Sequence, residues 1–201
     1  MKLYYLTGAC SLASNIALRD AGLKFELVKV DRNTRKAADG LDFNEVNPKG
    51  YVPVLTLDNG EVLTENVAVL QYIADRNPGA KLAPAAGTME RYRLMEWLSF
   101  INSEIHKSFS PLFNPGMPEE GKQIYRDRLA NRFGFVNGEL AGKDYVMGDH
   151  FTVADAYLYT VTRWAKPMAI DLTGFPNLVA FLERVSARPA VQEALKHEKL
   201  S

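Results

Sequence analysis

The chain contains a single cysteine, Cys10, in a position where a thiol could do chemistry. An apolar run over residues 3–6 ends in the small turn Thr7-Gly8-Ala9, and the pattern after Cys10 predicts a helix that Gly22 would end. Unpaired backbone N–H groups and the positive end of the helix dipole favour an anion there, so they can lower the pKa of a thiol. An inert, buried structural cysteine is the alternative, and this stretch alone does not decide between the two.

Polar residues also recur along residues 90–109, where the apolar residues keep the spacing of a helix. Ser99, Ser103 and His106 are four and three positions apart, so we expect them to share one helix face beside Asn102. A lone histidine of this kind is more often hydrogen-bonded or exposed than catalytic. The spacing therefore marks a polar stripe but assigns His106 no role.

The elements that would position these residues alternate in the first part of the chain, in the order β-α-β-(α)-β-β-α. The bracketed helix is a short basic segment, residues 32–39, and a loop is expected over residues 43–51. Thr64-Glu65-Asn66 opens the last helix. The strands are expected at residues 3–6, 25–31, 52–57 and 61–63, the last two joined by a turn at Asn59-Gly60.

The character of the sequence changes after a Pro- and Gly-rich linker, residues 77–88, beyond which the pattern is helical almost throughout. Thr152 and Asp155 resemble a capping box with Asp in place of the usual Glu or Gln, so we expect Asp155 to hold the fold rather than do chemistry. The sequence thus predicts an α/β domain over residues 1–76, a linker over 77–88 and an all-helical domain over 89–201.

The composition excludes several classes of protein. Lys plus Arg and Asp plus Glu both number 24, so there is no basic excess for a nucleic acid or an anionic membrane surface. No apolar run approaches the roughly 18 residues of a membrane span. The single cysteine forms no internal disulfide and favours a cytoplasmic protein. The three histidines are scattered, so we expect no metal site.

Five motifs, taken together and in this order, resemble the bacterial glutathione S-transferases of the beta, cysteine-type class. Each motif is weak alone, but their spacing along the whole chain is highly specific. The resemblance implies a thioredoxin-like N-terminal domain, an all-α C-terminal domain, a homodimer and glutathione as co-substrate. The motifs are Gly8-Ala9-Cys10-Ser11-Leu12, Val46-Asn47-Pro48 with Val52-Pro53-Val54-Leu55, Leu63-Thr64-Glu65, Glu104-Ile105-His106-Lys107 and Phe151-Thr152-Val153-Ala154-Asp155-Ala156.

The resemblance assigns glutathione-binding roles in the first domain. Pro53 is expected to be cis, so that the N–H and C=O groups of Val52 pair with the cysteinyl part of glutathione like an added strand. The helix start at Glu65-Asn66 suits the γ-glutamyl carboxylate, and the Glu65 side chain suits the ammonium group. The family more often has Ser or Gly at position 66. Arg35 or Lys36 would bind the glycyl carboxylate, and only Arg can do so with two hydrogen bonds.

In the resembling family, the polar face of the helix over residues 90–109 reaches the active site. His106 would lie near Cys10 and the glutathione sulfur, which makes Cys10 and His106 the candidate catalytic residues. Ser103 and Glu104 would approach the glutamyl end of glutathione from the neighbouring subunit. Ser99 and Ile105 complete the candidate glutathione-binding set.

The activity that this resemblance implies is attack of the glutathione thiolate on a hydrophobic electrophile, such as an aryl or alkyl halide or an activated alkene. Two alternatives remain open. Cys10 could itself be the nucleophile in thiol–disulfide exchange or reductive dehalogenation, or the protein could be a non-catalytic relative that binds apolar ligands. The sequence does not identify the electrophile, whose pocket would draw on Leu6, Thr7, Pro111, Phe113, Trp164 or their neighbours.

Overall fold

The first seven elements of the computed structural model, which describes residues 1–200, follow the order β-α-β-α-β-β-α. This is the order that the sequence predicts. The elements are β1 (Lys2–Tyr5), α1 (Ser11–Asp20), β2 (Glu26–Lys29), α2 (Phe43–Val46), β3 (Val54–Thr56), β4 (Val62–Thr64) and α3 (Asn66–Arg76).

Helices make up the remainder of the described chain. They are η1 (Pro78–Ala80), α4 (Met89–Phe100), η2 (Ile101–His106), α5 (Lys107–Phe109), α6 (Glu119–Glu139), α7 (Val153–Thr162), α8 (Pro176–Ser186) and α9 (Pro189–Glu198). Within residues 1–200, no helix combines the length and the apolar character that crossing a bilayer requires.

The chain divides into two compact units, and the division differs in one respect from the expected one. The first unit is Met1–Ala83 together with the chain from Arg188 on, and the second is Pro84–Ala187. We expected α9 to lie in the helical domain, but α9 packs against α1. The ion pairs Arg19–Glu193 and Arg188–Asp20 fix this packing.

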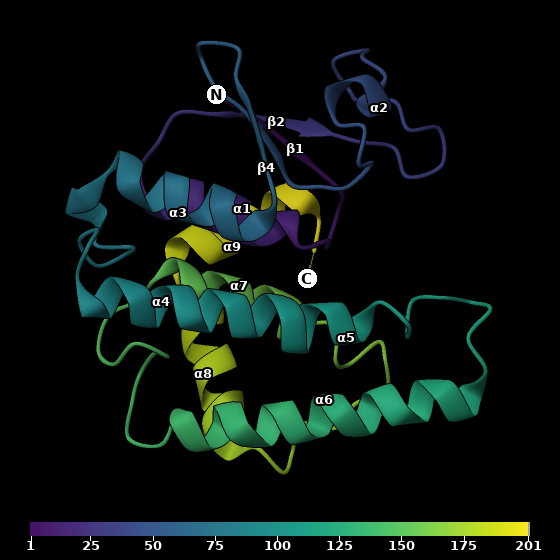
Figure 1. Cartoon of the computed structure of the whole chain (residues 1–201), viewed down its shortest axis with the longest axis vertical. Helices are drawn as coiled ribbons and strands as arrows, with labels where there is room; N and C mark the ends of the chain where they lie inside the picture. The colour runs from purple at the N-terminus through teal and green to yellow at the C-terminus, as the bar shows by residue number, and fades with distance from the viewer. Residues whose placement is uncertain (201) are drawn as a thin grey trace. The chain divides into compact units, whose positions relative to one another are not determined.

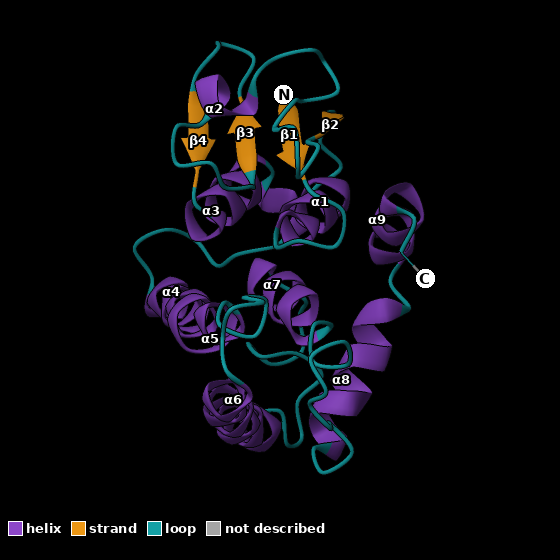
Figure 2. Cartoon of the chain, turned by 90° about the vertical axis from the view of Figure 1, so that its right-hand side faces the viewer, coloured by secondary structure: helices purple, strands orange, loops and turns teal. Residues whose placement is uncertain are grey.

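The sheet of the first unit has the strand order β2-β1-β3-β4. β1 pairs with β2 in parallel and with β3 antiparallel, and β3 and β4 form an antiparallel hairpin whose turn places Gly60 at a φ of +87°. Leu3 and Tyr4 are both buried, because side chains on both faces of β1 are covered. α1 and α3 lie side by side along the sheet (Figures 1 and 2), which is the thioredoxin-like arrangement.

The segment between β2 and β3 differs from the prediction. Residues 32–39 form no helix beyond a single turn, in which Arg35 N donates to Asp31 O at 3.1 Å. The segment takes part instead in isolated bridges, Val30 with Ala37 and Lys36 with Asp42. The helix falls instead at α2, inside the expected loop. The side chain of Asp42 accepts a hydrogen bond from Asn44 N at 2.8 Å and caps it, and the fully buried Phe43 anchors it.

The second unit is built around α7, in which every residue is buried. The expected capping box is present: Thr152 N and Thr152 Oγ1 both donate to Asp155 Oδ2, at 2.7 and 2.8 Å. Asp155 Oδ1 also accepts a hydrogen bond from Val146 N at 2.9 Å, which the sequence does not indicate. The carboxylate therefore ties the loop before α7 to the start of the helix.

The expected helix over residues 90–109 is continuous but not uniform. α4 passes into six residues of π-helix, η2, before α5 resumes the α-helical turn, and α6 runs alongside (Figure 1). A π-helical turn holds more residues than an α-helical one, and such turns occur frequently at functional sites. Here η2 carries Asn102, Ser103, Glu104 and His106, the polar residues singled out by the sequence.

Candidate active site

Cys10 lies at the junction of the loop after β1 with α1, as the sequence predicts. It occupies the N-cap position of α1 with φ −61° and ψ −20°, and it is 9% exposed. Its Sγ donates a hydrogen bond to the carbonyl oxygen of Val52 at 3.3 Å. The structure therefore holds Cys10 as a thiol, pointed at the backbone of the segment before β3.

The loop that carries Cys10 is held by short-range hydrogen bonds. Ala9 N donates to Leu6 O at 3.0 Å, and Ser11 Oγ accepts from Leu6 N at 3.3 Å. Gly8 adopts a φ of +71°, which glycine tolerates without cost, and its N–H donates to Glu198 in α9 at 2.9 Å. Sequence reasoning missed Glu198, because no local pattern reports a partner 190 residues away.

The peptide bond between Val52 and Pro53 is cis, which confirms the expectation from the resemblance. Both residues are buried, and the side chain of Val52 belongs to a core cluster with Tyr4, Phe43 and Val54. The carbonyl oxygen of Val52 accepts the hydrogen bond from the Cys10 thiol. A ligand N–H that binds this oxygen would therefore share it with Cys10.

Glu65 and Asn66 stand at the start of α3 in different environments. Glu65 is exposed, has a φ of +68° and pairs with Lys49, whose Nζ lies 2.7 Å from Glu65 Oε1. Asn66 is buried: its Oδ1 accepts from Ser14 Oγ at 2.8 Å and its Nδ2 donates to Cys10 O at 3.3 Å. The Asn66 side chain thus links α3 to Cys10, and its backbone N–H at the helix start is the group we consider for a ligand.

Arg35 and Lys36 are the alternatives for binding the glycyl carboxylate, and they lie in different surroundings. The Arg35 guanidinium lies 5.0 Å over the ring of Phe43 and donates a short hydrogen bond to Gly50 O. It therefore lies beside the segment that leads to Val52. Lys36 is exposed, and its backbone bridges to Asp42.

His106, at the end of η2, is part of a partly buried polar chain in the second unit. Its Nδ1 lies 2.6 Å from the hydroxyl oxygen of Tyr157, which donates to Asn102 Oδ1 at 3.0 Å. Because the one hydroxyl proton of Tyr157 goes to Asn102, Nδ1 of His106 is the donor in this network and Nε2 carries the free lone pair. Tyr157 is fully buried in α7, and sequence reasoning did not include it.

Burial lowers the pKa of His106 from its ordinary value of 6.5 to about 4, and the positive charge of Lys107 acts in the same direction. His106 is therefore neutral at physiological pH. A neutral imidazole with a bare Nε2 can accept a hydrogen bond or a proton, and it offers no positive charge to an anion.

The other candidate residues on the same helix lie in different environments. Ser99 and Ser103 are exposed and linked, since Ser103 Oγ donates to Ser99 O at 3.0 Å. The Ile105 side chain is fully buried in the core. Glu104 is held by Arg132 and Arg128, 2.7 and 3.0 Å from its Oε2, and their hydrogen bonds lower the pKa of its carboxyl group.

A cluster of aromatic side chains lies beside His106. Its ring centroid is 5.1 Å from that of Trp164, which in turn lies 5.5 Å from Phe109 and 5.4 Å from Phe113. Phe113 is 50% exposed. Phe113 and Trp164, two of the residues proposed from the sequence for the electrophile, therefore share one aromatic surface. In the first unit, Leu6 is half-buried and Thr7 is exposed.

The two units match the two domain models of one family. Residues 8–76 match the model of the glutathione S-transferase N-terminal domain, and residues 100–189 match that of the C-terminal domain. The chain belongs to the glutathione S-transferase family, as its motifs predict.

Individual relatives narrow this assignment. The chain is 46% identical to Glutathione S-transferase GstA of Escherichia coli O157:H7, and the match covers 100% of both chains. It is similar to a bacterial beta class glutathione S-transferase from Sphingomonas chungbukensis, with 51% identity, a TM-score of 0.96 and 100% of both chains covered. A sphingomonad glutathione S-transferase complexed with glutathione gives 50% identity and a TM-score of 0.97, again over 100% of both chains. The protein is a bacterial-type glutathione S-transferase, and conjugation of glutathione is its activity.

Proposed function

We propose that the protein joins the thiol of glutathione to a hydrophobic, aromatic electrophile, with glutathione held by the first unit. One observation carries this proposal: Cys10, the carbonyl of Val52 and the start of α3 converge through direct hydrogen bonds. They present a thiol, a strand-like backbone and a helix N-terminus within one small region. Glutathione offers a thiol, a peptide backbone and a γ-glutamyl carboxylate in the same order.

The glutamyl end of glutathione would bind at α3. The first backbone N–H groups of the helix face its carboxylate, and the exposed Glu65 carboxylate faces its ammonium group. In the structure, Lys49 Nζ forms an ion pair with the Glu65 carboxylate. The ammonium group of glutathione would replace Lys49 Nζ in this pair. The guanidinium of Arg35 keeps further donors beyond the one bound to Gly50, and we assign the glycyl carboxylate to it.

In the second unit, we assign the role of proton acceptor to a neutral His106. Its bare Nε2 can accept a proton, and the hydroxyl of Tyr157 fixes this tautomer. The aromatic group formed by Phe109, Phe113 and Trp164 would bind the electrophile, because flat apolar rings stack on such surfaces. Planar aryl electrophiles are therefore the favoured substrate class.

Replacing Glu65 by glutamine should weaken glutathione binding about tenfold, because the ligand ammonium group loses a charged acceptor worth roughly 1.5–3 kcal/mol. Isothermal titration calorimetry with reduced glutathione measures this change. Glu61→Gln is the matched control, since Glu61 is another exposed acid of the same hairpin region and should leave the affinity unchanged. Equal affinities of wild type and Glu65→Gln would show that Glu65 does not meet the ammonium group.

We also propose that the protein is a homodimer. An exposed hollow of about 330 Å³ on the second unit is lined by Trp97, Phe100 and Phe135, whose rings pack with centroids 5.2–6.2 Å apart, and by Glu96 and Glu139. Phe135 is 51% exposed in the single chain, and apolar surface of this kind favours a protein partner. The exposed Ser99 and Ser103 lie on the neighbouring helix α4–η2.

Phe135→Asp should convert the dimer to a monomer, because a carboxylate at this position would have to be buried without a partner. Static light scattering at micromolar concentration distinguishes the dimer from the monomer mass of 22.5 kDa. Ile124→Asp changes another exposed apolar residue of α6, 68% exposed, and should leave the dimer intact. A monomer mass for the wild type would contradict the proposal.

The cytoplasm is the compartment that suits this activity, and we propose it as the location. Reduced glutathione is the co-substrate, and Cys10 is in no disulfide. Both need a compartment that keeps thiols reduced.

A further inference from the structure

The chain leaves α7 in a pair of tight turns, residues 163–170, that carry Trp164. Met168 N donates to Trp164 O at 3.2 Å and to Ala165 O at 3.1 Å. The turns end at Ala169, whose φ of +56° breaks the helical path. The position of Met168 is therefore coupled to that of Trp164 through the backbone.

The end of these turns is a Schellman motif. Ile170 N donates to Ala165 O at 2.9 Å, and Ala169 N donates to Lys166 O at 3.2 Å. These bonds satisfy two of the last carbonyl groups of the turn. The carbonyl of Met168, at the cap position, accepts instead from a side chain of another helix.

That side chain is Arg126, in α6. Its Nε donates to Met168 O at 3.1 Å, in a partly buried place, and its NH1 donates to Glu119 and Gln123 of α6 itself. The Arg126 side chain is 20% exposed, whereas that of Glu119 is 71% exposed. Because an exposed ion pair contributes little, the bond from Nε to Met168 O is the one that joins the two segments firmly.

Trp164 is the residue whose position depends on this bond. Its ring meets those of Phe109 and Phe113 edge-on, at interplanar angles of 88° and 80°. Such pairs need the edge of one ring over the face of the other, so a shift of the turn that carries Trp164 would weaken both contacts. α6 supports the same aromatic group at a second place, since the ring centroids of Phe133 and Phe109 are 6.4 Å apart.

We infer that Arg126 is a positioning residue for Trp164. Through Met168 O it fixes the turn after α7 against α6, and so sets the angle at which Trp164 meets the two phenylalanine rings. On the proposed function, on which this step rests, it thereby sets the shape of the surface that the electrophile contacts. The affinity for glutathione, which we assign to the first unit, does not depend on it.

Two substitutions at position 126 separate this role from the charge of the side chain. Glutamine places Nε2 where arginine has Nε, so Arg126→Gln keeps a donor for Met168 O. Methionine places a methyl group there, so Arg126→Met keeps an unbranched side chain of that length and loses the donor. Both variants lose the pair with Glu119, and both new residues favour a helix, so α6 is retained.

The first measurement is the fluorescence of Trp164, which needs no ligand. The chain has two tryptophans, so Trp97→Phe leaves Trp164 as the source of the emission. In that background we expect Arg126→Met to increase the quenching of Trp164 by acrylamide and to shift its emission to longer wavelength, because the ring loses its fixed contacts. Arg126→Gln should give the quenching constant of the Trp97→Phe parent.

The second measurement is conjugation kinetics in the otherwise unchanged protein, with chlorodinitrobenzene as the aryl electrophile. In Arg126→Met we expect the KM for the electrophile to rise about fivefold, the effect of weakened edge contacts between aromatic rings, while the KM for glutathione stays within about twofold. Arg126→Gln should keep both values within about twofold of wild type. Glu119→Gln, which breaks only the exposed pair, is the matched control and should do the same.

Two results would overturn the inference: parental quenching of Trp164 in folded Arg126→Met, or a folded Arg126→Gln variant with the same changes as Arg126→Met. The expected fluorescence change with an unchanged KM for the electrophile would support Arg126 as the positioning residue of Trp164. It would count against the electrophile surface of the proposed function alone.

Discussion

Replacing Cys10 by alanine should abolish the covalent adduct that the protein forms with oxidised glutathione. In the wild type, the Cys10 thiolate attacks one sulfur of the disulfide, a mixed disulfide forms and one reduced glutathione leaves with the electron pair and a proton. Cys10 is the only cysteine, so the variant offers no other sulfur for this exchange. Intact-mass spectrometry should show one added glutathione on the wild type and none on the variant.

The conjugation rate of Cys10→Ala should stay within about tenfold of wild type, because the loss amounts to one hydrogen bond to the thiolate. Two adjacent thiolates repel each other, so Cys10 and bound glutathione are not charged together. The bond from Sγ to Val52 O already shows Cys10 as a donor, the form it would need beside a glutathione thiolate. The backbone N–H groups at the helix starts of the first unit remain in the variant.

Thr7→Ala is the control for this experiment, since Thr7 is exposed in the same loop and should form the adduct as the wild type does. An adduct of equal yield on Cys10→Ala, or none on the wild type, would remove Cys10 from the proposed chemistry.

The second large effect is expected at Asp155. Asp155 is fully buried, and its carboxylate accepts hydrogen bonds from Val146 N, Thr152 N and Thr152 Oγ1. Asp155→Ala removes this acceptor and breaks the cap of α7. Donors left unpaired in the core cost about 1–3 kcal/mol each, so we expect a loss of about 3–5 kcal/mol in the free energy of unfolding. Chemical denaturation followed by circular dichroism measures it, and the affinity for glutathione of the folded fraction should be retained.

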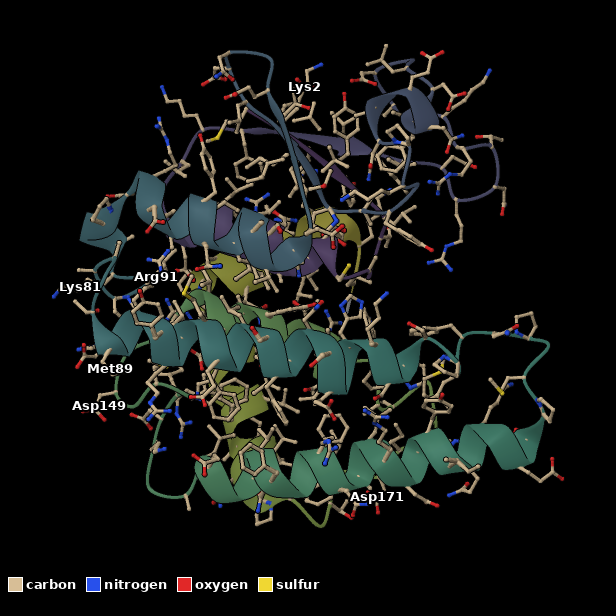
Figure 3. All side chains as sticks on the ribbon, in the orientation of Figure 1. Lys2, Lys81, Met89, Arg91, Asp149 and Asp171 are labelled. Atoms are coloured by element: carbon tan, nitrogen blue, oxygen red, sulfur yellow. The ribbon has the colours of Figure 1, made fainter. Side chains whose placement is uncertain are left out.

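Asp149→Ala is the matched control, because Asp149 lies exposed in the loop before α7 (Figure 3) and should change stability by no more than about 0.5 kcal/mol. Unchanged stability of Asp155→Ala, or normal stability with lost glutathione binding, would contradict a structural role for Asp155.

The same carboxyl group should make stability depend on pH. Burial raises the pKa of Asp155 from its ordinary value of 3.8 to about 6, against the hydrogen bonds from Val146 and Thr152. The folded state therefore binds the proton more tightly than the unfolded state. This contribution is fully present below pH 3.8 and is lost as pH rises through 6, a change of about 3 kcal/mol.

His106 contributes with the opposite sign, because its pKa is lowered to about 4 in the folded state. Its contribution is present above pH 6.5 and is lost as pH falls toward 4. The difference in stability between wild type and Asp155→Asn, measured from pH 4 to 7, isolates Asp155. A difference that does not vary over this range would disprove the raised pKa.

Much of the fold follows from local patterns. The strand–turn–helix sequence around Cys10 and the Thr152–Asp155 box are short-range signals, and the structure has both where they were expected. The cis bond before Pro53 came from the resemblance, since a proline alone does not report its isomer. The short helix near residue 43 was misplaced, because the basic composition of residues 32–39 resembled a helix while burial of Phe43 decided the outcome.

The parts of the site that escaped prediction depend on distant contacts. The pairing of Glu104 with Arg128 and Arg132 needs α6 beside η2, which no spacing reveals. The polar chain from His106 through Tyr157 to Asn102 needs α7 beside the π-helical turn. Local periodicity reports which face of a helix is apolar, but it does not report which other helix that face meets.

The return of α9 to the first unit has a consequence for synthesis on the ribosome. The first unit consists of the earliest and the latest parts of the chain, with a whole helical unit encoded between them. While the nascent chain is growing, the sheet and α1 can form, but the hydrogen bonds from Gly8 N and Asn15 Nδ2 to Glu198 cannot form until Glu198 emerges from the exit tunnel. The contacts between this loop and α9 therefore form only after the helical unit has been translated.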